Sequence, residues 1–223
     1  MQGLPCYSRR KTSIHLLIMK IHKININGFF SNTYAITADG KTAVVIDPSS
    51  KHVESKLLAL GLEVKYVLLT HCHFDHVGGA GVLQQAGAKV LCLAQEKPLI
   101  GTRSDLFEEF GVPRSYYTIS ETLTDGQEVE LCGLKIKALS TGGHTIGSAS
   151  YIVEHNGDRC LFSGDTLFKN TIGRTDLPTS SLSQLRESLK KLCALDDMPV
   201  YAGHGWETTL EEERNNNPFL QDL

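Results

Sequence analysis

Ten consecutive residues, 70–79, read Thr-His-Cys-His-Phe-Asp-His-Val-Gly-Gly and hold a dense group of side chains that bind metals. Four candidate ligands fall within six positions, namely His71, His73, Asp75 and His76. This density favours a metal site over a solvated polar turn, because histidine and aspartate are costly to bury unless they bind something. The chemistry of such a site is the activation of water and the polarisation of a carbonyl group.

The segment follows residues 66–69 (Tyr-Val-Leu-Leu), an apolar run that predicts a buried strand. Side chains alternate along an extended chain, so the ligands up to Asp75 would point one way and Cys72 the other. The Cys72 thiol is therefore expected to pack inside the protein. His76 directly follows Asp75 and would project differently, toward a second metal. Residues 77–86, which begin with glycine-rich sequence, predict a helix.

Strands and helices follow one another along the chain, without a linker, a low-complexity boundary or a strong repeat. Their spacing predicts one domain of mixed α and β structure. Alternating or apolar runs predict strands at residues 20–25, 33–37, 42–46, 64–70, 89–93, 128–131, 134–139, 148–154, 159–162 and 200–202. Helical spacing predicts helices at residues 52–60, 77–86, 181–194 and 207–214.

Three more candidate ligands each come directly after a predicted strand. His144 stands in a glycine-rich run, Asp165 in Ser-Gly-Asp-Thr-Leu-Phe, and His204 in Tyr-Ala-Gly-His-Gly. Each is modest evidence alone, because a glycine turn can carry any exposed residue. The pattern His-x-His-x-Asp-His at residues 71–76, together with these three contexts in this order, resembles the metallo-β-lactamase superfamily. The resemblance spans nearly all of residues 19–219.

The resemblance implies a four-layer αββα sandwich, with two β-sheets face to face, helices outside and metals in loops at one edge. It implies a first metal held by His71, His73 and His144. It implies a second metal held by Asp75, His76 and His204. Asp165 would bridge the two metals, and Asp47 would support the metal loop through hydrogen bonds.

The implied ligands are mostly nitrogen with some carboxylate, which suits two divalent zinc ions and also accepts iron or manganese. We expect the ions about 3.5–4 Å apart, with a hydroxide between them as the nucleophile. Asp75 is the candidate for handling a proton or orienting that hydroxide. A thiolate leaving group, with a pKa of about 8.5, needs little protonation, whereas an amide nitrogen needs an acid. A thioester substrate therefore fits this site.

Residues 167–176 and 203–220 resemble the glyoxalase II branch, in its short bacterial form. This implies hydrolysis of an S-2-hydroxyacylglutathione to glutathione and a 2-hydroxy acid. Lys169 and Arg174 could bind a substrate carboxylate. Full-length members carry a C-terminal helical domain that supplies much of the glutathione site, whereas this sequence ends soon after Phe219. Thioester hydrolysis is therefore a firmer expectation than glutathione specificity.

Three other functions remain open. A mononuclear-iron persulfide dioxygenase would share much of this pattern, with its iron held by His71, His73 or equivalents, His144 and Asp165. The context of Asp165 and the absence of a convincing secretory signal argue against a β-lactamase. The full set of seven ligands argues against a catalytically idle metal-binding protein. The sequence after His204 favours glyoxalase II. Two zinc ions per chain would favour hydrolysis, and one iron would favour oxygenation.

Composition narrows the class of protein further. Basic and acidic residues nearly balance, 22 against 25 among 223 residues, which argues against nucleic-acid binding, and no apolar run approaches the length of a membrane span. Six cysteines without Cys-x-x-Cys spacing are typical of a reduced, cytoplasmic protein. The expected partner is a small-molecule thioester, and the expected assembly a monomer or small homo-oligomer. Residues 1–18 differ from the rest and are expected to be a non-native or disordered extension of a domain at 19–223.

Overall fold

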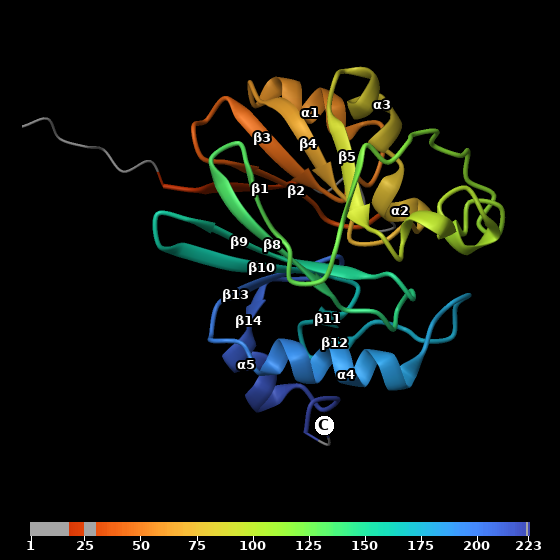
Figure 1. Ribbon diagram of the computed structural model, residues 1–223, viewed down its shortest axis with the longest axis vertical. Helices are drawn as coiled ribbons and strands as arrows, with labels where there is room; N and C mark the ends of the chain where they lie inside the picture. Colours follow the sequence, from red (N-terminus) through yellow and green to blue (C-terminus); the bar gives the residue numbers. More distant parts are fainter. Residues whose placement is uncertain (1–17, 25–29, 222) are drawn as a thin grey trace, which may run out of the picture.

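The computed structural model describes residues 18–24, 30–221 and 223. Apart from Ile18, the extension expected at residues 1–18 lies outside this described part. Two six-stranded sheets pack against each other and helices cover their outer faces, which gives four layers (Figure 1). The predicted αββα sandwich is therefore confirmed.

The first sheet has the strand order β1-β2-β3-β4-β5-β6. Its strands are β1 (Lys20–Ile24), β2 (Thr33–Thr37), β3 (Thr42–Ile46), β4 (Glu63–Leu68), β5 (Lys89–Leu93) and β6 (Glu121–Leu123). The pairs from β3 to β6 are parallel, whereas β1, β2 and β3 are antiparallel neighbours. Parallel pairing brings the carboxyl ends of β3 and β4 to one edge of the sheet, directly before Asp47 and the 70–76 segment.

The second sheet has the strand order β14-β13-β10-β9-β8-β7. Its strands are β7 (Glu128–Leu131), β8 (Leu134–Ser140), β9 (Ala149–His155), β10 (Asp158–Gly164), β13 (Pro199–Ala202) and β14 (Thr208–Thr209). A separate hairpin consists of β11 (Leu167–Phe168) and β12 (Thr171–Ile172). The strands β8, β10 and β13 run in the same direction, because β9 is antiparallel to both β8 and β10, and β10 is parallel to β13. Their carboxyl ends therefore meet at one edge.

Helices cover the outer face of each sheet (Figure 1). Those beside the first sheet are α1 (Val53–Ala59), α2 (Phe74–Val77) and α3 (Ala80–Gln85), and those beside the second are α4 (Leu182–Cys193) and α5 (Leu210–Asn216). Two short 3-10 helices, η1 (Lys97–Leu99) and η2 (Arg103–Asp105), follow β5. A buried cluster that includes Tyr34, Tyr151 and Phe162 fills the space between the sheets. Two further clusters lie between the sheets and their helices.

Two predicted helices differ from the structure. The helix expected at 77–86 is interrupted, because α2 ends at Val77 and α3 begins at Ala80. The two intervening glycines pack against backbone. A Cβ atom on Gly78 would lie 2.5 Å from the carbonyl oxygen of Ser49, and one on Gly79 would lie 2.5 Å from that of Ser50. The helix expected at 207–214 begins at Leu210, because the two preceding residues pair with β13 as strand β14.

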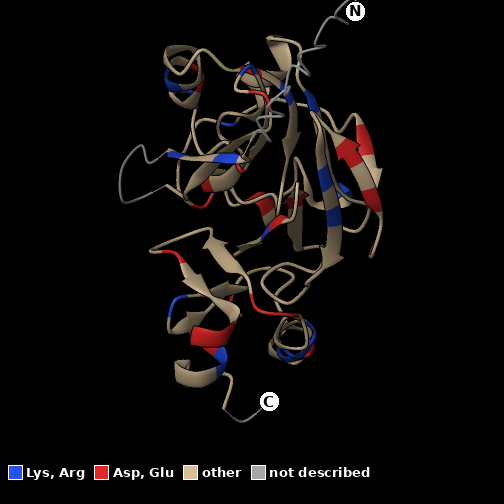
Figure 2. Ribbon diagram, turned by 90° about the vertical axis from the view of Figure 1, so that its left-hand side faces the viewer, with Lys and Arg blue, Asp and Glu red and all other residues tan. Residues whose placement is uncertain are grey.

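In the ribbon of Figure 2, segments coloured for basic and for acidic residues occur in both halves of the molecule rather than being separated by sign. This mixture agrees with the near balance of charge in the sequence. Within the described part of the chain, every helix is too short or too polar to cross a bilayer.

Candidate metal centre

The seven candidate ligands lie on loops and one short helix at the shared edge of the two sheets. His71 and His73 follow β4, while Asp75 and His76 belong to α2. The remaining three follow β8, β10 and β13, and are His144, Asp165 and His204. The structure therefore brings together all seven residues from segments up to 133 positions apart in the sequence (71 to 204).

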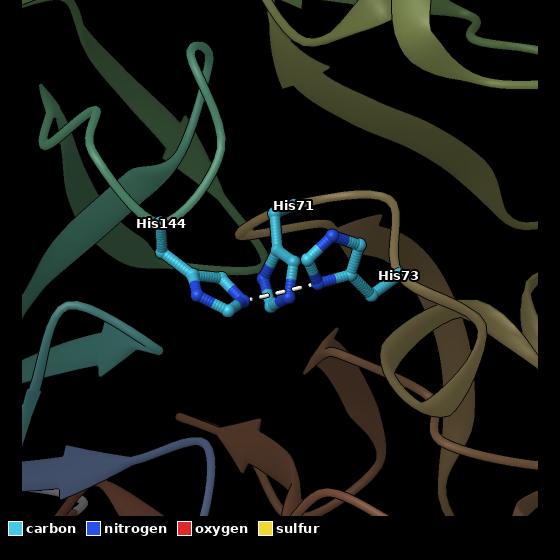
Figure 3. Close-up of side chains that lie close together, drawn as sticks. All are labelled: His71, His73 and His144. Atoms are coloured by element: carbon cyan, nitrogen blue, oxygen red, sulfur yellow. Dashed lines mark hydrogen bonds between the residues drawn. The ribbon is translucent and has the colours of Figure 1, made fainter. Parts of the chain in front are cut away.

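The first group consists of three buried histidines. One nitrogen from each of His71, His73 and His144 lies within 4.8 Å of the others. Figure 3 shows the three rings converging on a common space, with Nε2 of His144 3.0 Å from Nδ1 of His73. We call these residues the first triad.

The second group consists of Asp75, His76 and His204, whose ligand atoms also lie within 4.8 Å of one another. Nε2 of His204 is 3.2 Å from Oδ2 of Asp75. His76 is completely buried, whereas 37% of the His204 side chain is exposed, so solvent reaches the centre from this side. We call these residues the second triad.

Asp165 lies between the two triads. Its Oδ2 atom is 3.5 Å from Nε2 of His144 in the first triad. The same oxygen is 3.5 Å from Nε2 of His204, and Oδ1 is 3.3 Å from Nε2 of His76. One carboxylate therefore faces both groups, which is the arrangement that a bridge between two cations requires.

Four buried polar atoms of this centre have no hydrogen-bond partner among the described residues. They are Nε2 of His71, His73 and His76, and Oδ1 of Asp165. Buried polar atoms in folded proteins are nearly always paired, because leaving one unpaired costs about 1–3 kcal/mol. Divalent cations at the two triads would satisfy Nε2 of His71, Nε2 of His76 and Oδ1 of Asp165, while His73 faces His144 through its Nδ1 atom. The residues present therefore fit a pair of metal ions.

Hydrogen bonds orient the second nitrogen of three ligands. Nδ1 of His76 pairs with Oδ2 of Asp47 at 2.8 Å, and Nδ1 of His71 contacts Oγ1 of Thr70 at 3.0 Å. Nδ1 of His144 is 2.9 Å from the carbonyl oxygen of Arg174. Such contacts fix the ring orientation and the tautomer of a metal-binding histidine.

Asp47 comes close enough to His71 and His76 to be considered a ligand itself. Its oxygens are already used, however: Oδ1 accepts from the Thr70 N–H at 2.8 Å, and Oδ2 accepts from the Thr70 hydroxyl at 2.6 Å and from His76. Asp47 therefore supports the ligands in this structure.

Burial and charge set the protonation of these groups. Burial lowers the pKa of His71 well below its usual value and that of His73 to about 3, so both rings are neutral, as metal binding requires. Burial also disfavours charge on His204, but Asp165 and Asp75 outweigh it and raise the pKa of His204 to about 9. A cation bound between these carboxylates would take the place of that proton.

The local conformation of the motif differs from the sequence prediction in one respect. The chain is extended at His73, but Asp75 belongs to α2, so the expected strand-like alternation does not continue to this residue. Cys72 is fully buried and belongs to no group of candidate ligands in the described part of the chain. Burial is the main cause that raises the pKa of the Cys72 thiol, and the neighbouring Glu96 raises it further.

The two predicted substrate-binding cations are paired within the chain. Nζ of Lys169 lies 3.1 Å from Oε1 of Glu212. Arg174 binds Asp176 through two bonds, of 2.6 Å from Nε and 2.7 Å from Nη2. Arg174 nevertheless lies beside the centre, because its carbonyl oxygen contacts the ring of His144.

Sequence reasoning missed two residues that contact the ligand loops, Thr70 and Glu96. Thr70 directly precedes the motif, and its position at a strand end next to two histidines was a usable signal. Glu96 lies between Gln95 and Lys97 in a polar stretch after β5, and no local pattern distinguishes it.

The family model described as the metallo-beta-lactamase superfamily matches residues 26–204. The chain is 35% identical to a hydroxyacylglutathione hydrolase, GloC, of Haemophilus influenzae, over 91% of this chain and 98% of the relative. Among solved structures it resembles the BLEG-1 B3 metallo-beta-lactamase, with a TM-score of 0.82 and 30% identity over 91% of this chain and all of the other. It also resembles TTHA1623 in a di-iron-bound form, with a TM-score of 0.78 and 31% identity over 89% of this chain and all of the other.

Proposed function

This chain belongs to the metallo-beta-lactamase superfamily, and we propose that it is a metal-dependent thioester hydrolase that cleaves an S-2-hydroxyacylglutathione to glutathione and a 2-hydroxy acid. The observation that carries the hydrolytic part of the proposal is the position of Asp165 between the two triads. The similarity to a hydroxyacylglutathione hydrolase over nearly the whole of both chains supports the choice of substrate.

In this proposal the first triad, His71, His73 and His144, holds one divalent cation. The second triad, Asp75, His76 and His204, holds the other, and Asp165 contacts both. Two bound cations would supply the Lewis acidity that polarises the thioester carbonyl and ionises an attacking water near neutral pH. The nitrogen-rich ligand set suits zinc and also accepts iron or manganese.

Asp75 is the acidic residue that we assign to the attacking water. Its Oδ2 atom faces the more exposed side of the centre, 3.2 Å from Nε2 of His204 and 3.7 Å from Nε2 of His76. From this position its carboxylate would orient the water and receive a hydrogen bond from it. The leaving thiolate needs no proton from the protein, because a thiol with a pKa of about 8.5 leaves as the anion.

Arg174 is the better candidate of the two cations for a substrate carboxylate. It lies next to His144 through its backbone, and its guanidinium is exposed. A substrate carboxylate would have to compete with Asp176 for the two N–H donors. Exchange of one exposed carboxylate for another is inexpensive, because an exposed ion pair contributes only about 0–1 kcal/mol.

The test combines metal counting with three activity assays on the purified protein. We expect two metal ions per chain and hydrolysis of S-lactoylglutathione, which is measured through the free thiol that it releases. Oxygen consumption with glutathione persulfide, together with one iron per chain, would replace the proposal with a persulfide dioxygenase. Hydrolysis of a β-lactam without hydrolysis of the thioester would place the chain functionally with the lactamases it resembles.

A further inference from the structure

We propose that Glu96 is a positioning residue of the metal centre, whose carboxylate ties the loop carrying His71 and His73 to the loop carrying His144. The inference rests on the metal site proposed above and concerns how the first triad is held together. Glu96 itself contacts no cation site directly; it acts through the neighbours of the three ligands.

The two oxygens of Glu96 bind two different loops. Oε1 accepts a hydrogen bond of 2.8 Å from the backbone N–H of Cys72, the residue between His71 and His73. Oε2 accepts a hydrogen bond of 2.8 Å from the hydroxyl of Thr145, the residue that follows His144. One side chain therefore connects segments that lie 24 and 49 positions away from it in the sequence.

The loop after His144 lies directly against the backbone next to Glu96. A Cβ atom on Gly147 would overlap the backbone nitrogen of Glu96, so only glycine allows this approach. Within the loop, the hydroxyl of Ser148 accepts from the Thr145 N–H at 3.0 Å and lies 2.8 Å from the Thr145 hydroxyl. The Thr145 side chain is therefore held in the direction that meets the carboxylate.

Glu96 is fully buried, and an anion in such a place is costly to the fold. Burial raises the pKa of Glu96, while the hydrogen bonds from Cys72 and Thr145 oppose that shift. Hydrogen bonds to an ionised acceptor are about twice as strong as those between neutral groups, so the charge strengthens the link between the two loops. A neutral acceptor at this position would link the loops more weakly.

The link matters because the first triad is assembled from two loops on different sheets. His71 and His73 follow β4 of the first sheet, whereas His144 follows β8 of the second. A cation binds most tightly when its ligands are already at the correct separation, and loss of an outer supporting contact typically costs about 10–100-fold in metal affinity or activity. Asp47 supports His76 of the second triad and, through Thr70, His71 of the first, but none of its hydrogen bonds within the described part of the chain reaches the loop of His144.

The experiment measures Zn²⁺ affinity by competition with a chromophoric chelator, in a His204→Ala background where the second triad is incomplete. We expect Glu96→Gln to weaken Zn²⁺ binding about 10–100-fold. Thr145→Val should weaken it similarly, and the double variant should lose little more than either single variant, because both remove the same link. Thr145→Ser, which keeps the hydroxyl, should bind Zn²⁺ more tightly than Thr145→Val.

Glu213→Gln is the matched control. Glu213 is also fully buried and accepts three bonds, from Asn170 N–H, Thr208 hydroxyl and Asn217 amide, none of which belongs to a ligand residue. We expect it to change the unfolding temperature without changing Zn²⁺ affinity. Equal Zn²⁺ loss in both Glu variants would reduce Glu96 to a structural residue and overturn the inference.

Wild-type Zn²⁺ affinity in Glu96→Gln would also overturn the inference, even if the unaltered protein binds two metals and hydrolyses thioesters. If the unaltered protein bound no Zn²⁺ and hydrolysed no thioester, the proposed function would fail first. The binding assay involves no substrate, so these two failures are distinguishable.

Discussion

Oδ2 of Asp47 lies 2.8 Å from Nδ1 of His76 and accepts a hydrogen bond of 2.6 Å from the hydroxyl of Thr70. Thr70 in turn contacts Nδ1 of His71 at 3.0 Å. One carboxylate oxygen at the end of β3 therefore supports a histidine of each triad, and it leaves both Nε2 atoms facing the centre of the site.

We expect Asp47→Asn to lower metal affinity and hydrolysis by about 10–100-fold, because a neutral amide is a weaker acceptor for His76 and Thr70. Asparagine tolerates the positive φ angle of 50° found at Asp47, whereas alanine does not. Asp47→Ala should therefore also lower the free energy of unfolding by about 1–2 kcal/mol. Metal counting and urea unfolding on both variants test this. Unchanged metal affinity in Asp47→Asn would remove Asp47 from the support of the site.

We expect Asp165→Asn to retain one metal ion but lose the pair, since a neutral amide is a poor bridge between two dications. Hydrolysis should fall at least about a hundredfold, as when one electrostatic element of a catalytic site is removed. Asp75→Asn serves as the comparison, because Asp75 belongs only to the second triad and its loss should spare the first metal. A variant of Asp165 that still binds two ions and turns over normally would exclude the bridge.

Gly203→Ala should displace two of the candidate metal ligands, Asp165 and His76. A Cβ atom there would overlap Oδ1 of Asp165 and lie 2.8 Å from Cε1 of His76, so the ligands would have to move. A displacement of about 1 Å can cost about a hundredfold in rate, and we expect a loss of that size.

Gly205→Ala is the control for the Gly203 variant. A Cβ atom on Gly205 meets nothing within 4 Å, although its φ angle of 77° disfavours alanine. This control should lose about 1 kcal/mol of stability and keep its metals. If both variants bind metal equally well, the close approach at Gly203 is unimportant.

Stability should depend on acid pH through Asp39, in the turn between β2 and β3. Hydrogen bonds from the backbone N–H groups of Lys41 and Thr42 lower the pKa of Asp39 from 3.8 to about 2. A carboxyl whose pKa is lower in the folded state stabilises the fold above its unfolded pKa, and this contribution is lost as pH falls.

In the metal-free protein, the stability difference between wild type and Asp39→Asn should therefore be constant above pH 3.8 and disappear as pH falls through about 2. Urea unfolding across this range measures the difference. A difference that does not change with pH would show that the ionised carboxylate of Asp39 contributes nothing specific.

Much of the framework could be predicted from local sequence. The strands predicted at 33–37, 42–46 and 89–93 match β2, β3 and β5, because each is a short apolar, β-branched run bounded by turn residues. The helix predicted at 181–194 matches α4 to within one residue at each end, and Ser181 caps it by accepting from the Gln184 N–H. The motif at 71–76 and the strand-end contexts of His144, Asp165 and His204 identified the candidate ligands.

Tertiary structure alone decided how those ligands are oriented and supported. The helical conformation is interrupted at Gly78 and Gly79, where the backbone of residues 48–50 packs against the two glycines. Asp75 therefore lies on a separate short helix. The link from Glu96 to Cys72 and Thr145 depends on three segments that meet only when the two sheets pack. Local propensity acts over a few residues, whereas these contacts join residues 24 to 49 positions apart, and so no local pattern in the sequence could indicate them.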